Sequence, residues 1–189
     1  MKVIQLFKNE AQLIKRAAKN NREAQQKLYE RHSPKMLSVC RQYVKDLHDA
    51  EEVMLNGFLK GFNHLSDFRN DGSFEGWMRR IMVREAISFL RKQKKIEFAT
   101  DFSEEVAAFS DPITSGFNAA HIQELIDSLP EGYRMVFVMY TVDGYKHSEI
   151  AKMLKISEGT SKSQLFKARK VLQEKLEQEN KTGYGTEKI

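Results

Sequence analysis

Apolar residues recur three and four positions apart along most of the chain, and this spacing constrains the fold more than any other feature. The pattern is clear in segments 36–44, 53–62 and 77–82. No segment shows the alternation of apolar and polar residues that predicts a half-buried strand. We therefore expect an all-α protein whose first half is a bundle of about four helices.

The charge changes sign along the chain and divides it into segments. Segment 79–95 carries seven basic residues and one acid, whereas segment 96–116 carries five acids and no lysine or arginine. Segment 146–175 is basic again, and turn-forming sequences lie at 110–112 and 114–116. We predict two small helical domains, residues 1–95 and 117–178, joined by an acidic linker at 96–116 and followed by a flexible tail at 179–189.

Composition excludes several classes of protein. The single cysteine, Cys40, cannot form an internal disulfide, and no apolar run approaches the roughly 20 residues of a membrane helix. The first residues lack the pattern of a signal peptide. The five histidines form no metal-spaced pair, and no phosphate-binding glycine loop is present. We expect a cytoplasmic protein that is not an enzyme, does not insert into membranes, and uses no cofactor or metal.

Residues 148–172 have the pattern of a helix-turn-helix motif. The small Ala151 lets two helices approach, Ile156 fills the turn, and Ser157 can cap the second helix. In such a motif the first side chains of the second helix reach base edges in the major groove. The alternative is a basic hairpin that binds protein. The candidate DNA-contacting residues are Thr160, Ser161, Lys162, Ser163, Gln164, Lys167, Arg169 and Lys170.

Two helices of the first domain can be outlined in the same way. Ser33 and Pro34 predict a helix start, because proline fits the first turn of a helix. A helix over residues 73–94 would be about 33 Å long, with an apolar stripe and a basic face. That basic face suits a nucleic acid, or it is solvated surface. Trp77 is expected in the core.

These features together resemble a known family, the bacterial sigma factors of RNA polymerase, in the extracytoplasmic-function (ECF) group. The resemblance covers nearly the whole chain. The sequences that carry it are DAEEV at 49–53 with FLK at 58–60, FEGWMRRI at 74–81, LP at 129–130 with Arg134, GYKHSEIA at 144–151, SEGT at 157–160 and KAR at 167–169.

The resemblance implies a promoter-specificity subunit that supports promoter melting and transcription initiation. Its first domain would bind core polymerase and hold the unpaired minus-ten element, and its second would read the minus-thirty-five element. The implied partners are core RNA polymerase, promoter DNA and an anti-sigma factor. The implied core-binding residues are Asp49, Glu52, Leu55, Asn56 and Phe58. The implied minus-ten contacts are Arg69, Asn70, Ser73, Arg80, Arg84, Arg91 and Lys92.

One departure from the family and two alternatives bear on this hypothesis. Leu55 and Asn56 stand where the core-binding helix of the family usually has glutamine and an acidic residue. In the family the linker threads channels built for RNA, a role that an acidic chain can fill.

The main alternative is a helix-turn-helix regulator that acts without replacing a sigma subunit. Such a regulator would need a ligand pocket or phosphoacceptor in the first domain. An RNA-binding protein would use similar basic patches, but no RNA-binding motif is recognisable.

Overall fold

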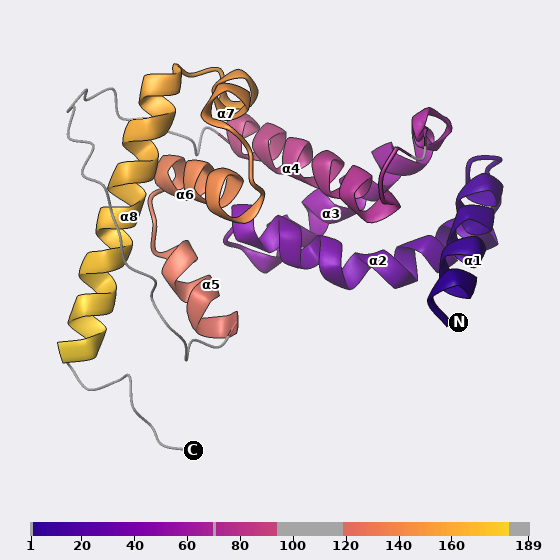
Figure 1. Cartoon of the computed structure of the whole chain (residues 1–189), viewed down its shortest axis with the longest axis horizontal. Helices are drawn as coiled ribbons and strands as arrows, with labels where there is room; N and C mark the ends of the chain where they lie inside the picture. Colours follow the sequence, from indigo (N-terminus) through magenta and orange to yellow (C-terminus); the bar gives the residue numbers. More distant parts are fainter. Residues whose placement is uncertain (1, 70, 94–118, 182–189) are drawn as a thin grey trace. The chain divides into compact units, whose positions relative to one another are not determined.

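A computed structural model describes residues 2–69, 71–93 and 119–181, and side chains are described from residue 10 to residue 179 within these ranges. The chain divides into two units, Met1–Gln93 and Lys94–Ile189 (Figure 1). Every regular element among the described residues is helical, which confirms the all-α prediction. None of the described helices is long and apolar enough to cross a membrane. The predicted acidic linker and residues 182–189 of the predicted tail lie outside the described residues.

The first unit contains four α-helices, as the apolar spacing predicts. They are α1 (Lys2–Ala17), α2 (Arg22–Tyr43), α3 (Leu47–Asn63) and α4 (Phe74–Lys92), with a short 3-10 turn, η1 (Leu65–Asp67), after α3. Helix α2 packs against the other three helices, and α3 packs against α4. The side chains of Asn21, Asp46 and Ser73 cap the starts of α2, α3 and α4 by accepting a backbone N–H three residues ahead.

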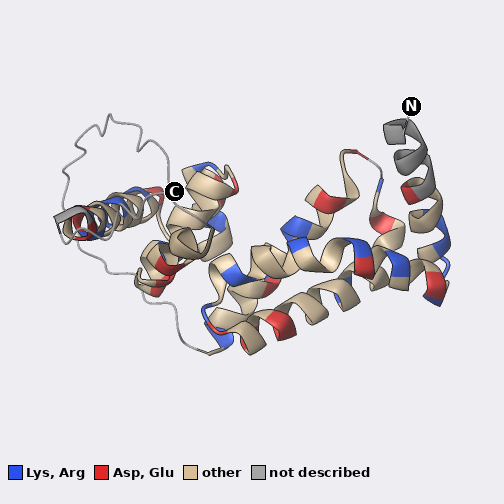
Figure 2. Cartoon of the chain, turned by 90° about the horizontal axis from the view of Figure 1, so that it is seen from below, with Lys and Arg blue, Asp and Glu red and all other residues tan. Residues whose placement is uncertain are grey.

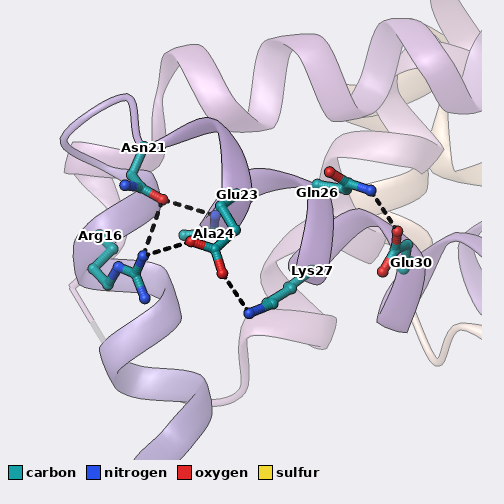
Figure 3. Close-up of polar contacts among 7 residues, drawn as sticks. All are labelled: Arg16, Asn21, Glu23, Ala24, Gln26, Lys27 and Glu30. Atoms are coloured by element: carbon teal, nitrogen blue, oxygen red, sulfur yellow. Dashed lines mark hydrogen bonds and ion pairs between the residues drawn. The ribbon is translucent and has the colours of Figure 1, made fainter.

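A polar network fixes the turn between α1 and α2 (Figure 3). Asn21 Oδ1 accepts the N–H of Ala24 at 2.9 Å. The guanidinium of Arg16 donates to Glu23 at 3.1 Å, and the ammonium of Lys27 donates to the same carboxylate at 2.6 Å. Lys27 and then Arg16 lower the pKa of Glu23. The turn is thus held by contacts on the surface, and salt screens them.

Helices α3 and α4 approach closely because α3 presents two glycines to α4. A Cβ atom on Gly57 would lie 2.3 Å from Sδ of Met82, and one on Gly61 would lie 2.6 Å from Sδ of Met78. Both methionines are completely buried. Glycine at these two positions therefore sets the separation of the two helices.

The prediction that Ser33 and Pro34 begin a helix is wrong, because both lie inside α2. Proline removes one backbone donor and crowds the preceding turn. The helix continues because buried side chains on both sides of the proline, including Leu28 and Met36, pack on one face. Pro34 itself is exposed.

The second unit contains α5 (Ala119–Asp127), α6 (Glu131–Phe137), the π-helical turn η2 (Val138–Val142), α7 (His147–Leu154) and α8 (Glu158–Lys181). Helix α8 packs against α6 and α7. Arg134 is buried beside the carboxylates of Glu131 and Asp127, the latter at 3.9 Å. Helix α8 runs on through residues 179–181, which the sequence analysis assigns to the tail, and Glu179 Oε2 lies 3.1 Å from His121 Nε2 of α5.

Candidate functional site

Helix α3 has an outer face with two exposed leucines. The side chains of Glu52, Leu55, Asn56 and Leu59 lie three and four residues apart and therefore share one face of the helix. Leu55 is 53 % exposed and Leu59 61 % exposed. We call these four residues the α3 outer face. Exposed leucines beside a carboxylate and an amide are suited to contact with another protein.

The predicted core-binding residues divide between surface and interior. Glu52, Leu55 and Asn56 are exposed, and Asp49 is partly exposed in the first turn of α3. The prediction that Phe58 contacts core polymerase is wrong, because this side chain is only 3 % exposed and belongs to the core of the first unit. Its ring meets that of Tyr29 edge-on at 4.9 Å. Leu59, its neighbour on the surface, lies in the FLK motif but is not among the predicted core-binding residues, although its spacing from Leu55 places both on one helical face.

Helix α4 presents arginines to solvent while its acids are paired elsewhere. Acidic and basic residues are both spread over the helices of the first unit (Figure 2), so the local pairing decides the character of this face. Glu75 pairs with Lys35 of α2 at 2.6 Å, and Glu85 pairs with Lys60 of α3 at 2.8 Å. Arg80 and Arg84 are exposed one helical turn apart. This face therefore has a local excess of positive charge.

The other predicted minus-ten residues have different environments. Arg69 and Lys92 are exposed, and Arg91 is partly buried. Ser73 accepts the N–H of Gly76 at 3.0 Å, so it caps α4 in the free protein. Asn70 lies outside the described residues.

A pocket of about 310 Å³ lies beside the arginine face of α4. The residues that line it are Lys60, His64, Asp67, Trp77, Ile81, Arg84 and Glu85. Trp77 is partly exposed rather than fully buried, and its ring packs against Phe68 at 5.5 Å and Phe74 at 5.9 Å. No local sequence pattern predicts this pocket, because it forms only where the end of α3 meets α4. Its aromatic wall, cations and carboxylates can receive a planar polar group such as a nucleobase.

In the second unit, the start of α8 carries the predicted DNA-reading residues. Ser157 accepts the N–H of Thr160 at 2.9 Å, which confirms the predicted cap. Lys155, in the turn, adopts a left-handed conformation with φ of 57°. Lys162, Arg169 and Lys170 are exposed, and Thr160, Ser163 and Lys167 are partly exposed.

Two of the predicted reading residues face the interior of the second unit. Ser161 and Gln164 are completely buried, so neither can reach a base edge in this structure. Ser161 Oγ lies 2.9 Å from Nδ1 of His147, across the helix-turn-helix. The predicted base contacts of Ser161 and Gln164 are therefore wrong, because not every polar side chain in the first turns of α8 faces outward.

No group of acids, cysteines and histidines that could hold a metal ion occurs among the described residues. Burial raises the pKa of the Cys40 thiol to about 12. A thiol in this state is a poor nucleophile. What the described residues do offer is an apolar helix face, an arginine face with a pocket, and a basic helix end, all of which are suited to binding.

Comparison with known proteins gives these surfaces a common context. Residues 28–96 match the model of sigma-70 region 2, and residues 120–172 match that of sigma-70 region 4. SigV of Bacillus subtilis, an RNA polymerase sigma factor, is 28 % identical over 149 residues, which span 79 % of this chain and 89 % of SigV. The ECF RNA polymerase sigma-E factor of Escherichia coli K12 is 29 % identical over 178 residues, which span 87 % of this chain and 93 % of that protein.

A solved structure has a similar fold. It is the sigma factor RpoE in complex with the anti-sigma factor NepR from Bartonella quintana, with a TM-score of 0.53 at 18 % identity, covering 80 % of this chain and 96 % of that one. The two matched regions occur in the order that the sequence motifs predict. The first runs from within α2 to just past the end of α4, and the second from α5 into α8. The chain therefore belongs to the sigma-70 family, as a sigma factor of the ECF group.

Proposed function

We propose that this promoter-specificity subunit divides its contacts among three helices: α3 for core polymerase, α4 for the minus-ten element and α8 for the minus-thirty-five element. The observation that carries the proposal is the pairing of α3 and α4. One helix exposes leucines and the other exposes arginines, while their inner faces pack closely through Gly57 and Gly61. A single unit can thus engage a protein and a nucleic acid at once.

The α3 outer face is suited to core polymerase. Full burial of an exposed leucine contributes about 1.5–3 kcal/mol, and since Leu55 and Leu59 are a little over half exposed, burying the rest of each contributes about 1–2 kcal/mol. Leu55 and Leu59 can therefore supply a substantial part of the binding energy, with Glu52 and Asn56 as polar rim. Where the family usually has glutamine and an acid, Leu55 and Asn56 make this face more apolar and less charged. We expect the contact to depend less on salt than a contact made through an acidic pair.

Helix α4 and its pocket are suited to the single-stranded minus-ten element. Arg80 and Arg84 are placed for phosphate contacts, and Trp77 offers an aromatic surface to an unpaired base. Extruding a base from the duplex costs a few kcal/mol and less once it is unpaired. We therefore assign melting to capture of the open strand, with Arg69, Asn70, Ser73, Arg91 and Lys92 as further candidate contacts.

Helix α8 is suited to the major groove of the minus-thirty-five element. Lys162, Arg169 and Lys170 carry positive charge on its exposed face, and Thr160 and Ser163 lie near its start. Residues near the start of a recognition helix meet base edges, and cations further along meet phosphates. With Ser161 and Gln164 buried, the reading set reduces to Thr160, Lys162, Ser163 and the basic residues that follow.

Run-off transcription with core polymerase over a promoter library tests the proposal. We expect specific transcripts from the wild type and their loss in Arg84→Ala. Arg22→Ala is the matched control, since Arg22 is an exposed arginine of α2 in the same unit.

A second experiment compares the protein with its native Leu55-Asn56 and a variant in which Gln-Glu replaces this pair. Transcripts gained only by the replacement would show that the native pair weakens core binding. Silence from all variants, with tight duplex binding in the absence of polymerase, would favour a helix-turn-helix regulator instead.

The same proposal includes the cellular setting. The chain acts as a binding subunit in the cytoplasm, where core polymerase and promoters are found, and it is not an enzyme. An anti-sigma factor is its regulatory partner, by analogy with the Bartonella sigma factor, whose structure contains one.

The linker at 96–116 occupies a polymerase channel built for RNA. Neutralising its five acids should change the ratio of abortive to full-length transcripts and leave promoter binding intact; unchanged ratios would contradict this role.

A further inference from the structure

His147 connects the two helices of the helix-turn-helix. It is the first residue of α7, and its Nδ1 lies 2.9 Å from Oγ of the buried Ser161 on α8. Its ring stacks on that of Tyr140 from η2, with centroids 4.5 Å apart and planes at 22°. The imidazole is therefore fixed on two sides by groups from two other elements.

The stack leads to a cation of the recognition helix. The guanidinium carbon of Arg169 lies 5.9 Å from the centroid of Tyr140, within range of a cation–π contact. His147, Tyr140, Ser161 and Arg169 thus form one cluster, which we call the His147 cluster. It links the start of α7 to two points of α8 that lie eight residues, or about 12 Å, apart along the helix.

The surroundings of His147 oppose its protonation in the free protein. Partial burial contributes most to lowering its pKa below the usual value, and the positive charges of Lys162 and Arg169 lower it further. Glu158, also on α8, acts in the opposite direction. From η2 the facing titratable group is the phenol of Tyr140. On α7 itself the carboxylate of Glu149 accepts the N–H of Lys146 at 2.8 Å. The neutral imidazole therefore predominates near pH 7.

DNA changes this balance, because it supplies the opposite charge at the same surface. Phosphates that pair with Lys162 and Arg169 remove the repulsion those cations exert on His147 and add a negative potential. A protonated imidazole can still donate from Nδ1 to Ser161, and on Tyr140 it gains a cation–π contact. The heavy-atom positions of the His147 cluster are therefore compatible with the added proton.

We propose that His147 is a positioning residue of the recognition helix and that it couples DNA binding by α8 to uptake of one proton. The inference rests on the proposed function, since it requires DNA against α8. The charged form is stabilised in the complex relative to the free protein, so binding tightens as pH falls and weakens as pH rises. Each tenfold gain in the proton affinity of His147 on binding tightens the complex by up to about tenfold at low pH.

The test is an anisotropy titration of the full chain with a labelled duplex of mixed sequence, about 30 base pairs long. Affinity is measured from about pH 7.5 to about pH 5.5 at constant ionic strength, because salt alone changes it. His147→Gln keeps a hydrogen-bonding side chain that cannot titrate. His121→Gln is the matched control: its partner Glu179 lies 18 residues beyond Ser161 on α8, about 27 Å away along the helix.

For each protein we compare the gain in affinity between about pH 7.5 and about pH 5.5. We expect this gain to be about three- to tenfold larger for the wild type and for His121→Gln than for His147→Gln. Equal pH dependence in the wild type and His147→Gln would overturn the inference while leaving DNA binding established. No binding by the wild type at any pH would overturn both the inference and the assignment of α8 to DNA. The ring protons of His147, followed by NMR, should also titrate at higher pH with DNA than without; coincident curves would contradict the coupling.

Discussion

Phe58 and Leu59 are neighbours in the sequence, and the structure predicts opposite consequences for their replacement by alanine. Phe58 is 3 % exposed and packs against Tyr29, with its ring centroid 5.8 Å from that of Phe62. Removing a buried phenylalanine ring costs about 3–5 kcal/mol. Because the whole free energy of unfolding of a domain is about 5–15 kcal/mol, Phe58→Ala should bring the first unit close to unfolding.

Leu59→Ala should leave stability almost unchanged, because the side chain is 61 % exposed. Surface substitutions usually change the free energy of unfolding by no more than about 0.5 kcal/mol. Its cost should fall on binding instead. Losing about 1–2 kcal/mol of leucine burial against core polymerase would weaken the complex about five- to thirtyfold.

Both effects can be measured in the intact two-unit chain. Trp77 is the only tryptophan of the protein, and it packs against Phe68 and Phe74 in the first unit. Its fluorescence during urea unfolding therefore reports on the first unit alone. Affinity for core polymerase is measured in parallel, with labelled protein and increasing polymerase.

The reasoning is refuted if Phe58→Ala keeps the wild-type unfolding midpoint and loses affinity for core polymerase. That result would mean that the ring of Phe58 reaches the interface, as the sequence alone suggested. A Leu59→Ala protein that unfolds early would likewise contradict its place on the surface.

Three further replacements or treatments test other parts of the structure. Gly57→Val should cost about 1–3 kcal/mol, because its Cβ would lie 2.3 Å from Sδ of Met82; the added Met82→Ala should recover part of that loss, as judged by Trp77 fluorescence. Arg134→Ala should destabilise the second unit by about 2–4 kcal/mol, because it leaves two acidic side chains without their buried partner; the cost is limited because these acids keep 22 % exposure to water. The thermal circular-dichroism transition of the second unit should shift, and the Trp77 transition should not. Cys40 should react with a thiol reagent at pH 8 only as fast as the first unit unfolds, because burial raises its pKa to about 12; rapid labelling of folded protein would contradict this.

The helical architecture could be predicted from sequence, because it depends on spacing alone. Leu28, Met36 and Val39 maintain a buried face across α2, and the same periodicity recurs in α3 and α4. Pro34 misled the prediction of a helix start, since proline is a local signal and packing along the whole of α2 overrides it. Ser157 was predicted as a cap, because a cap needs only the residue type and the helix that follows.

The binding surfaces could be predicted only in part. Sequence motifs indicate which helix carries a site, but the exposure of each side chain depends on where neighbouring helices pack. Phe58, Ser161 and Gln164 were therefore assigned to surfaces although they are buried. The pocket beside Trp77 was missed because its walls come from residues 60–67 and from α4, and no local pattern reports their meeting.

The connection between α3 and α4 is anchored on both sides of its tip. Phe68 packs edge-on against Phe74 at 5.8 Å and against Trp77, and Ser73 is held by the N–H of Gly76. Only residues 69–72 lie between these two anchors. Fixing the backbone of one residue costs about 1–2 kcal/mol of conformational entropy, and at Phe68 and Ser73 this entropy is already lost before any ligand binds. Between these anchors the sequence offers a ligand three side chains, those of Arg69, Asn70 and Asp71, because residue 72 is glycine.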